Sequence, residues 1–295
     1  MRVGLGLRLA SAGLLLAAAA FATAEAQVET LAGSILAGAP GDALEAFVET
    51  ARGADIVVLG EIHDNPQHHR NQAAVVAALA PAALVLEMIP QERETEVNEL
   101  RAAGADHAAL AAALDWAESG WPDFDVYAEI LEAAPQARIF GAGQPSADVS
   151  RAMLEGAAGV FGPDAAIYGL DQQLEPGEQA YREARQATAH CDMLPAEALP
   201  GMVEAQRFRD AGLADAALWA RTMTGGGQVV VIAGTGHADT VRGMPAMIAA
   251  AEPGAEVVAL GQFESSVDDP DAFDAVLQAP APERDDPCAA FAPTD

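Results

Sequence analysis

The sequence predicts an α/β protein in which a mainly parallel β-sheet is covered by helices on both faces. Three observations predict this class: short apolar runs recur along the chain, they are continuous rather than alternating, and helical segments separate them. Continuous apolar runs are typical of strands that are buried on both faces of a sheet. The runs are residues 55–59, 83–86, 138–140, 228–232 and 257–260.

Helices are expected between these strands. Asn65 and Pro66 begin the first one, because Asn is a good N-cap and Pro suits the first helical position. One helix lies between the first two strands and one between the last two, so both pairs form βαβ units with parallel strands. The expected helices are residues 66–80, 91–102, 124–134, 147–157, 176–191, 195–223 and 240–251. Residues 142–227 hold no strong strand, and we expect a helical cap or insertion over the sheet there.

The N-terminus has the pattern of a secretory signal. Arg2 and Arg8 give a positively charged start, an apolar run follows at residues 9–21, and residues 22–24 offer small side chains for cleavage. We expect residues 1–26 to be a cleaved signal peptide; a membrane anchor that is not cleaved is the alternative. No Cys follows the apolar run, so no lipid anchor of the bacterial lipoprotein kind is expected.

The remaining chain is expected to form one domain with a tail. Residues 27–264 make up the α/β domain, and residues 265–295 form an acidic tail rich in Pro and Ala that is expected to be disordered. No later segment is long and apolar enough to cross a membrane. Together with the signal peptide, this predicts an exported protein of the periplasm or cell envelope without a lipid anchor.

The chain is strongly acidic. Fifteen basic residues, all of them Arg, stand against 44 acidic ones, and the formal net charge is −29. Such a charge repels nucleic acid and anionic lipid surfaces, so neither is an expected partner. We interpret the charge as a solvated acidic surface rather than as a functional feature.

The two cysteines leave two interpretations open. An exported chain permits a disulfide between Cys191 and Cys288, which would tie the tail to the fold without defining it. Because Cys191 directly follows His190, a ligand or redox role for Cys191 is the alternative.

Ionisable residues gather where the predicted strands end. These are Glu61 and His63 after the first strand, Glu87 at the end of the second and His237 after the fourth. Ligands of open parallel sheets bind beyond the carboxyl ends of the strands, so we expect these residues to form one catalytic site of general acids and bases. Glu61, His63 and His237 also suit a divalent transition metal such as Mn, Co or Zn. Isolated Gly-x-x-His motifs without a function are the alternative.

A second group of candidates lies mainly on the expected cap. His190 ends one helix and Arg207 lies on the next, while Arg242 lies near the start of the last helix and could hold a carboxylate or phosphate. These residues are candidates for cofactor binding; a solvated helix face or an Arg that offsets local acidity is the alternative. His68 and His69, on the first helix, are interpreted as surface residues.

Ordered motifs along the chain resemble the ChaN family. VLGEIHDNP at residues 58–66 is followed by two histidines, and AGTGH at residues 233–237 is followed by GMP at residues 243–245. Between them, in the order of the family, lie LEM, LDW, WP, HCDM and QRFRD. The match runs from about residue 55 to residue 260.

The resemblance implies a ligand and a site. The family belongs to a wider group with Tiki-type proteases, TraB proteins and erythromycin esterases, whose members share paired Gly-x-x-His motifs and an acidic residue. The matching residues here are His63, His237 and Glu61. ChaN members are associated with haem binding and iron uptake, with haem held by a Tyr and two haems stacked between two subunits. The resemblance therefore implies haem as the cofactor and a homodimer around stacked haems.

No motif marks the Tyr that would bind haem. The chain has three tyrosines, Tyr127, Tyr168 and Tyr181. Tyr181 is the preferred ligand because Arg182 and Arg185 lie beside it on a long expected helix and Arg pairs with propionates. An ordinary amphipathic Tyr is the alternative at this position.

The predicted function is haem binding, for the uptake or handling of iron in the cell envelope. The alternative is a metal-dependent hydrolase that resembles Tiki proteases and erythromycin esterases, in which Glu61 or Glu87 is the base and a metal ion activates water. The sequence leaves open whether the chain is an enzyme.

Overall fold

A computed structural model describes residues 34–35, 40–286 and 288–289 of the chain. The chain divides into two compact units, Met1–Thr30 and Leu31–Asp295, and the described residues all belong to the second. The expected signal peptide, residues 1–26, lies outside the described residues.

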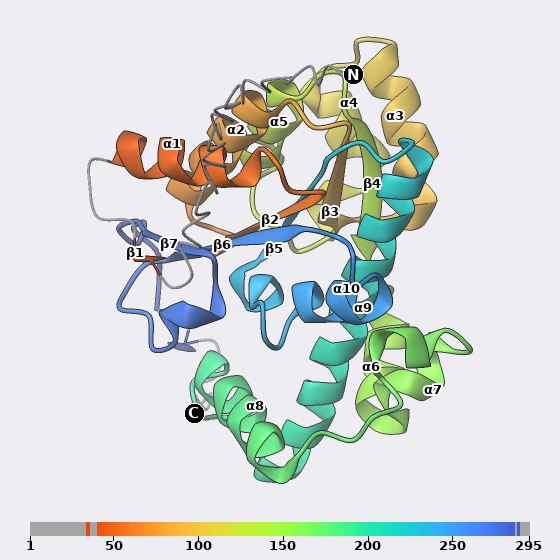
Figure 1. The fold of residues 1–295 in the computed structure, drawn as a ribbon, viewed down its shortest axis with the longest axis vertical. Coiled ribbons are helices and arrows are strands. Elements are labelled where there is room, and N and C mark those ends of the chain that lie inside the picture. The colour runs from red at the N-terminus through yellow and green to blue at the C-terminus, as the bar shows by residue number, and fades with distance from the viewer. Residues whose placement is uncertain (1–33, 36–39, 287, 290–295) are drawn as a thin grey trace, which may run out of the picture. The chain divides into compact units, whose positions relative to one another are not determined.

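The described residues form a seven-stranded sheet in which neighbouring strands are parallel (Figure 1). The strands are β1 (Ser34–Ile35), β2 (Ile56–Glu61), β3 (Ala83–Pro90), β4 (Arg138–Gly143), β5 (Val229–Gly234), β6 (Val257–Phe263) and β7 (Ala275–Gln278). Their order is β1-β7-β6-β2-β5-β3-β4, so β2, β5 and β3 are adjacent although they lie far apart in the sequence. The predicted α/β fold with a parallel sheet is confirmed, and all five predicted strands belong to it.

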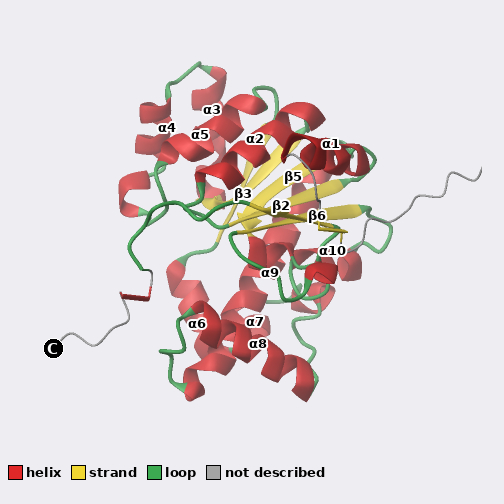
Figure 2. Cartoon of the chain, turned by 90° about the vertical axis from the view of Figure 1, so that its left-hand side faces the viewer, coloured by secondary structure: helices red, strands yellow, loops and turns green. Residues whose placement is uncertain are grey.

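Each face of the sheet packs against its own set of helices (Figures 1 and 2). Val57 and Leu59 of β2 belong to one buried apolar cluster, and Val58 between them belongs to the other. Successive side chains of a strand point to opposite faces, so this alternation is expected. Because both faces are covered, both sets of side chains are apolar, and the strands therefore read as continuous apolar runs.

The helices on the first face come from the N-terminal half of the described chain. They are α1 (Pro40–Ala51), α2 (Pro66–Leu79), α3 (Glu94–Ala102), α4 (His107–Ala113) and α5 (Phe124–Ala133). Helix α2 begins as predicted, because the side chain of Asn65 accepts hydrogen bonds from the backbone N–H groups of Gln67 and His68. Phe47 of α1 and Val75 of α2 are buried in the cluster that covers this face.

The second face is covered by helices that lie mainly between β4 and β5. They are α6 (Ser146–Glu155), α7 (Ala157–Phe161), α8 (Pro176–Ala189), α9 (Leu199–Met223) and α10 (Met244–Ala251). The predicted helix at residues 147–157 ends at Glu155, because Gly156 has a φ of 90°. Phe208 and Leu213 of α9 are buried against the sheet. None of the described helices combines the length and apolarity that a membrane crossing requires.

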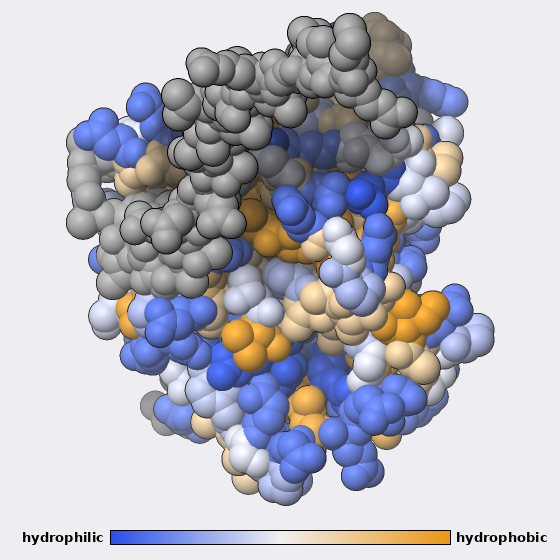
Figure 3. Space-filling model, in the orientation of Figure 1, coloured by the Kyte–Doolittle hydropathy of each residue, from blue (hydrophilic) through white to orange (hydrophobic). Residues whose placement is uncertain are grey.

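Helix α8 is the outermost helix of this cap. It packs against α9 and contains no buried residue. The part of the surface that carries α8 in Figure 1 is mostly hydrophilic in Figure 3. Short 3-10 turns connect these elements; they are η1 (Gln91–Arg93), η2 (Trp116–Glu118), η3 (Ala165–Tyr168), η4 (Ala196–Ala198), η5 (Thr235–Ala238) and η6 (Pro270–Ala272).

The C-terminal stretch differs from its prediction. The sequence predicts disorder for residues 265–295, but Ala275–Gln278 form β7, which pairs with β6 and β1. Val276 and Leu277 are buried, so the burial of a short apolar segment between β6 and β1 outweighs the polar composition around it. The prediction is wrong for this segment, and residues 290–295 lie outside the described residues.

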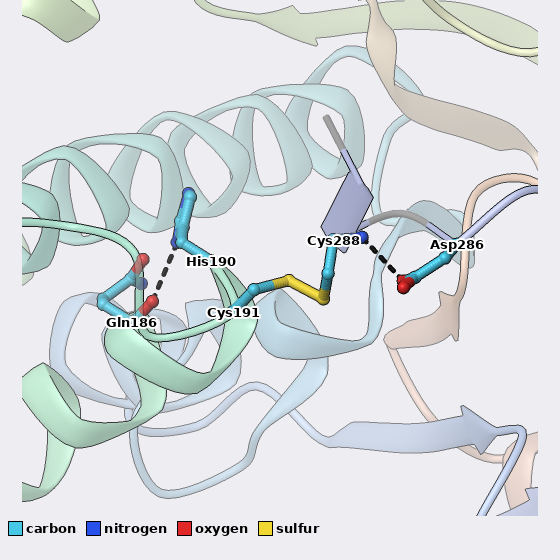
Figure 4. Close-up of a disulfide and its surroundings, with 5 residues drawn as sticks. All are labelled: Gln186, His190, Cys191, Asp286 and Cys288. Atoms are coloured by element: carbon cyan, nitrogen blue, oxygen red, sulfur yellow. Dashed lines mark hydrogen bonds between the residues drawn. A yellow bond between two sulfur atoms is a disulfide. The ribbon is translucent and has the colours of Figure 1, made fainter. Parts of the chain in front are cut away.

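A disulfide joins the tail to the cap (Figure 4). Cys191, just beyond the end of α8, is bonded to Cys288, and their Cα atoms are 5.7 Å apart. Of the two interpretations that the sequence leaves open, the structure shows the disulfide, and Cys191 is therefore not a free thiol. Arg284 of the tail also forms ion pairs with Asp64 and Glu264, so the tail lies against the loop that follows β2.

Candidate functional site

The carboxyl ends of β2, β5 and β3 meet at the middle of one sheet edge. Glu61 ends β2 and Gly234 ends β5. Glu87 lies in β3 where its pairing with β4 shifts register, and the backbone N–H of Gly234 donates to Glu87 Oε2 at 2.8 Å. The adjacency of these strands therefore brings the ends that carry Glu61, His63, Glu87 and His237 together, as the sequence predicts.

Glu61 and His63 form a hydrogen-bonded pair that fixes the orientation of the imidazole ring. His63 Nδ1 lies 2.8 Å from Glu61 Oε1, and the hydroxyl of Tyr127 donates to the same oxygen at 3.0 Å. The side chain of Glu61 is fully buried, whereas 35% of the His63 side chain is exposed. Because the carboxylate holds Nδ1, the imidazole is oriented with Nε2 beside Gly234. That nitrogen can exchange a proton or bind a ligand atom.

The surroundings of His63 favour its charged form. Burial lowers the pKa of His63, but the hydrogen bond to Glu61 and the charge of Glu87 raise it, and the net shift is upward. The ring of Trp121 packs edge-on against the imidazole, with the ring centroids 4.9 Å apart. His63 is therefore held by a carboxylate on one side and an aromatic ring on another.

Two histidines of α2 contact Glu61 and the backbone of the loop that carries His63. His69 Nε2 lies 2.7 Å from the carbonyl oxygen of His63, and His69 Nδ1 lies 3.3 Å from Glu61 Oε2. His68 Nδ1 accepts a hydrogen bond from the backbone N–H of Ile62 at 2.9 Å. Both side chains are buried, so their interpretation as surface residues is wrong. The first turn of α2 packs against the end of β2, and these rings position the loop rather than face solvent.

His237 lies in a second buried cluster with two carboxylates. Its Nε2 is 3.3 Å from Glu87 Oε1 and its Nδ1 is 2.6 Å from Asp210 Oδ1. Burial opposes a charged ring, but Glu87 and Asp210 outweigh it and raise the pKa of His237 to about 10. Burial also raises the pKa of Glu87, but His237 and His63 outweigh it and lower that pKa to about 2. Glu87 and His237 are therefore a buried carboxylate and imidazolium.

Tyr127 and Asp210 complete the two clusters. The sequence does not predict Tyr127 for this site, whereas Asp210 lies in a helix motif that could orient the site residues or bind an anion. Tyr127 lies on α5 and Asp210 on α9, so helices from opposite faces of the sheet reach the same edge. Asp210 Oδ2 has no hydrogen-bond partner within the described chain, and burial raises the pKa of this carboxyl group. The QRFRD motif was a signal for Asp210; no motif marks Tyr127.

Two cavities open beside these clusters and meet at His63 and Arg209, which line both. Cavity 1 has a volume of about 670 Å³, and its lining includes Glu87, Trp121 and His237. Cavity 2 has a volume of about 560 Å³ and extends to α8. Its lining includes Arg182, Arg185, His190 and Arg242.

Tyr181 of α8 lies between two arginines of cavity 2. The Cζ atom of Arg242 is 4.2 Å from the centre of its ring, and that of Arg185 is 5.9 Å away. Arg185 Nη1 also donates to the Tyr181 hydroxyl at 3.4 Å. His190 Nδ1 lies 2.8 Å from the carbonyl oxygen of Gln186 at the end of α8 (Figure 4). Three of the predicted cofactor-binding residues thus line one cavity, and the fourth, Tyr181, contacts two of them.

The chain matches the family described as haem-binding uptake, Tiki superfamily, ChaN over residues 47–248, more than half of its length. The chain belongs to the ChaN family. The predicted family is confirmed, and the matched region contains both carboxylate–histidine clusters and the linings of both cavities. Membership in this family supports haem as the ligand.

A solved structure of the same family supports the fold. ChaN of Campylobacter jejuni, which binds haem cofacially, is 20% identical, with a TM-score of 0.61 over 79% of this chain and 90% of that one. The type III effector HopBA1 is 12% identical, with a TM-score of 0.48 over 81% of this chain and 94% of that one. At 20% identity the first likeness concerns the fold alone, and the second carries no argument. No curated protein matches the chain.

Arg207, a predicted cofactor-binding residue, instead holds a loop of this ChaN-family chain in place. Its guanidinium donates to the carbonyl oxygens of Gly169, Leu170 and Gln172 and pairs with Glu204 at 2.8 Å. It lines neither cavity 1 nor cavity 2. Its donors are occupied by the loop between α7 and α8, so the prediction of a cofactor role finds no support.

The metal prediction finds no support either. Among the residues that the structure describes, no group of three or more His, Cys, Asp and Glu side chains is arranged to hold a metal ion. Glu61 is bound by His63 and Tyr127, and Nε2 of His237 faces Glu87. Because no such group is arranged and Glu61 and His237 are engaged with other protein groups, we derive no reaction step through a metal ion.

Proposed function

We propose that this ChaN-family chain binds haem at Tyr181 and acts in the uptake or handling of haem iron in the cell envelope. Family membership supports haem as the ligand. Tyr181 is the observation that carries the proposal, because a Tyr oxygen is one of the ligands that proteins supply to haem iron. Of the three tyrosines, it is the one whose hydroxyl does not donate to a carboxylate.

The other two tyrosines are poorly suited to bind iron. The Tyr127 hydroxyl donates to Glu61 at 3.0 Å, and the Tyr168 hydroxyl donates to Asp215 at 2.8 Å. Burial and the neighbouring carboxylates raise the pKa of both hydroxyls well above the ordinary value. A raised pKa disfavours the phenolate form that ferric iron binds. The hydroxyl of Tyr181 instead receives its hydrogen bond from a guanidinium group.

The charges beside Tyr181 fit this ligand. Arg185 and Arg242 flank the ring, and positive charge stabilises an anionic oxygen bound to iron. Haem also carries two propionate groups, and carboxylates are the groups that guanidinium binds best. The residues present therefore fit haem, which when bound would supply the iron chemistry at this site.

Cavity 2 offers both room and apolar surface. Its volume of about 560 Å³ lies within the range of about 300–1,000 Å³ that is usual for small-molecule sites. Ala189, Met202 and Val203 contribute apolar surface, against which a porphyrin ring can pack. His190 lines the same cavity and stays a predicted cofactor contact.

We further propose that the chain acts outside the cytoplasm and pairs around its ligand. Residues 1–26 have the pattern of a signal peptide, and the Cys191–Cys288 disulfide is of a kind that persists in oxidising compartments. The Campylobacter jejuni relative binds haem cofacially. By analogy, we propose two haems stacked between two copies of this chain, which sedimentation with and without haem would test.

A haemin titration of residues 27–295 tests the proposal. We expect a saturable change in visible absorption with a defined stoichiometry. Tyr181→Phe should remove the absorption band of the phenolate–iron bond and weaken binding by about tenfold or more. A non-saturating response of the wild type would contradict haem binding.

Tyr168→Phe is the matched control. It also removes one Tyr hydroxyl from the second face of the sheet, but that hydroxyl donates to the carboxylate of Asp215, whereas the Tyr181 hydroxyl accepts from Arg185, which lines cavity 2. This variant should keep the wild-type spectrum and affinity. An unchanged spectrum in Tyr181→Phe would exclude Tyr181 as the ligand.

A further inference from the structure

We infer that Arg185 and Arg209 bind the two propionate groups of haem in cavity 2. The inference rests on the proposed haem binding and adds to it the residues that hold the carboxylate edge of the porphyrin. It places one propionate at α8, beside Tyr181, and the other at the junction of the two cavities, beside His63.

Cavity 2 concentrates positive charge in a chain that is otherwise acidic. Its lining includes four arginines, although the whole chain has only 15 basic residues against 44 acidic ones. These arginines are Arg182, Arg185, Arg209 and Arg242. A net charge of −29 repels an anionic porphyrin, so its capture requires a local excess of positive charge. The composition of this wall therefore indicates an anionic ligand.

The acidic residues of the same wall do not cancel this charge, because each already has a partner. Asp239 accepts hydrogen bonds from two backbone N–H groups and pairs with Arg242 at 3.4 Å. Asp210 pairs with His237 at 2.6 Å. Both carboxylates are buried, so they present little charge to the cavity.

Two of the four arginines are also engaged. Arg182 pairs with Glu178 at 2.7 Å and donates to the carbonyl oxygen of Arg242. Arg242 pairs with Asp269 at 3.0 Å in addition to Asp239. These guanidinium groups are held by the protein, which leaves the other two arginines for a ligand.

Arg209 makes no ion pair or hydrogen bond within the described residues. Its neighbours on α9 do: Arg207 binds three carbonyl oxygens, and Asp210 binds His237. Arg209 is partly buried and lines both cavities where they meet. A guanidinium that has lost part of its water without a counter-ion gains strongly from a ligand carboxylate.

Arg185 of α8 is exposed to solvent and, like Arg209, has no counter-ion within the described residues. Within the described chain it contacts the hydroxyl and ring of Tyr181 and pairs with no carboxylate. Helices α8 and α9 thus each present to cavity 2 one guanidinium without a counter-ion. Haem carries two carboxylates on one edge, and the two sets of groups match in number and charge.

Haemin and haemin dimethyl ester distinguish propionate binding from other contributions. The two ligands share the macrocycle and the iron, but the ester has no carboxylate charge. We expect Arg209→Ala and Arg185→Ala each to weaken haemin binding by about tenfold or more, as for the loss of a charge-assisted hydrogen bond. Arg209→Ala should not change the affinity for the ester and should keep the phenolate–iron band. Arg185→Ala also removes the guanidinium beside the Tyr181 hydroxyl, so it should weaken ester binding too, but less than it weakens haemin binding.

Arg138→Ala is the matched control. Arg138 also pairs with no carboxylate in the described chain, but it lies over the ring of Phe140 and lines neither cavity. This variant should bind both ligands as the wild type does. If Arg209→Ala does not fold, Arg209→Gln keeps most of the side chain and allows the same comparison.

The outcomes separate this inference from the function on which it rests. Equal losses for haemin and its ester in the Arg209 variant, or no loss for haemin, would overturn the inference and leave haem binding intact. A wild-type chain that does not bind haemin would overturn both. A loss confined to haemin in Arg209→Ala, together with a larger loss for haemin than for the ester in Arg185→Ala, supports the assignment.

Discussion

Glu87 and His237 form an ion pair with little exposure to solvent, in which Oε1 lies 3.3 Å from Nε2 and the side chains are 11% and 8% exposed. Asp210 holds the other ring nitrogen of His237. The pair connects β3 to the turn that follows β5, its neighbour in the sheet. An unpaired buried charge costs several kcal/mol. Removal of any one of these three groups should therefore lower the free energy of unfolding, because it leaves the charge of another without a partner.

We expect the free energy of unfolding to depend on pH through this pair. The pKa of His237 is raised from 6.5 to about 10, so its stabilisation is complete below about pH 6.5 and is lost as the pH rises through about 10. The pKa of Glu87 is lowered from 4.5 to about 2, so its stabilisation is present above about pH 4.5 and is lost as the pH falls through about 2. Asp210, whose pKa burial raises, partly offsets the gain from Glu87 as the pH rises above 3.8. Urea unfolding across this range should show greatest stability near pH 4.5–6.5.

Glu87→Gln tests whether this ion pair is responsible. The variant leaves a buried imidazolium with one carboxylate fewer, and we expect it to lose about 3–5 kcal/mol at pH 5.5 and much of the dependence on pH. Glu132→Gln breaks the exposed pair with His107 and is the control, with an expected change below about 1 kcal/mol. Equal effects of the two substitutions would argue against the buried pair.

Gly60→Ala should destabilise the fold where Gly236→Ala does not. A Cβ atom at Gly60 would lie 2.9 Å from the Cα atom of Thr235 and 3.0 Å from the carbonyl oxygen of Leu260, so strands would have to move apart. We expect a cost of about 1–3 kcal/mol. The nearest atom to a Cβ at Gly236 is the side-chain nitrogen of Gln206, at 3.8 Å. Thermal unfolding of both variants measures the difference, and a larger effect at Gly236 would contradict the packing.

Removal of the Cys191–Cys288 disulfide should loosen the cap more than the sheet. The bond closes a segment of 97 residues, and removal of a native disulfide typically costs about 2–5 kcal/mol of stability. Helix α8 has no buried residue, whereas α2 has several. When both cysteines are replaced by Ser, the rate of amide hydrogen exchange should therefore increase more in α8 than in α2. The wild type with a reductant should behave like the double variant, and the reductant should not affect that variant. Equal exchange in α8 with and without the bond would contradict this prediction.

The sequence by itself determines the sheet and where its chemistry lies. Strands that are buried on both faces are apolar at nearly every position, so runs such as residues 55–59 and 228–232 can be recognised as strands from the sequence. Parallel strands bring their carboxyl ends to one edge, and this rule is enough to bring Glu61 and Glu87 into one site. The motifs that carry the ChaN resemblance lie at these same strand ends.

Only the tertiary structure decides the partners of those residues. Tyr127 and Asp210 come from helices on opposite faces, and the sequence pattern of a helix tells which side is buried but not which polar group that side meets. The same holds for Arg207 and Arg209, two positions apart on α9: one is bound by a loop, and the other faces two cavities without a counter-ion. Strand β7 likewise forms because β6 offers it an edge. These outcomes depend on contacts between segments far apart in the chain, and local pattern carries no information about them.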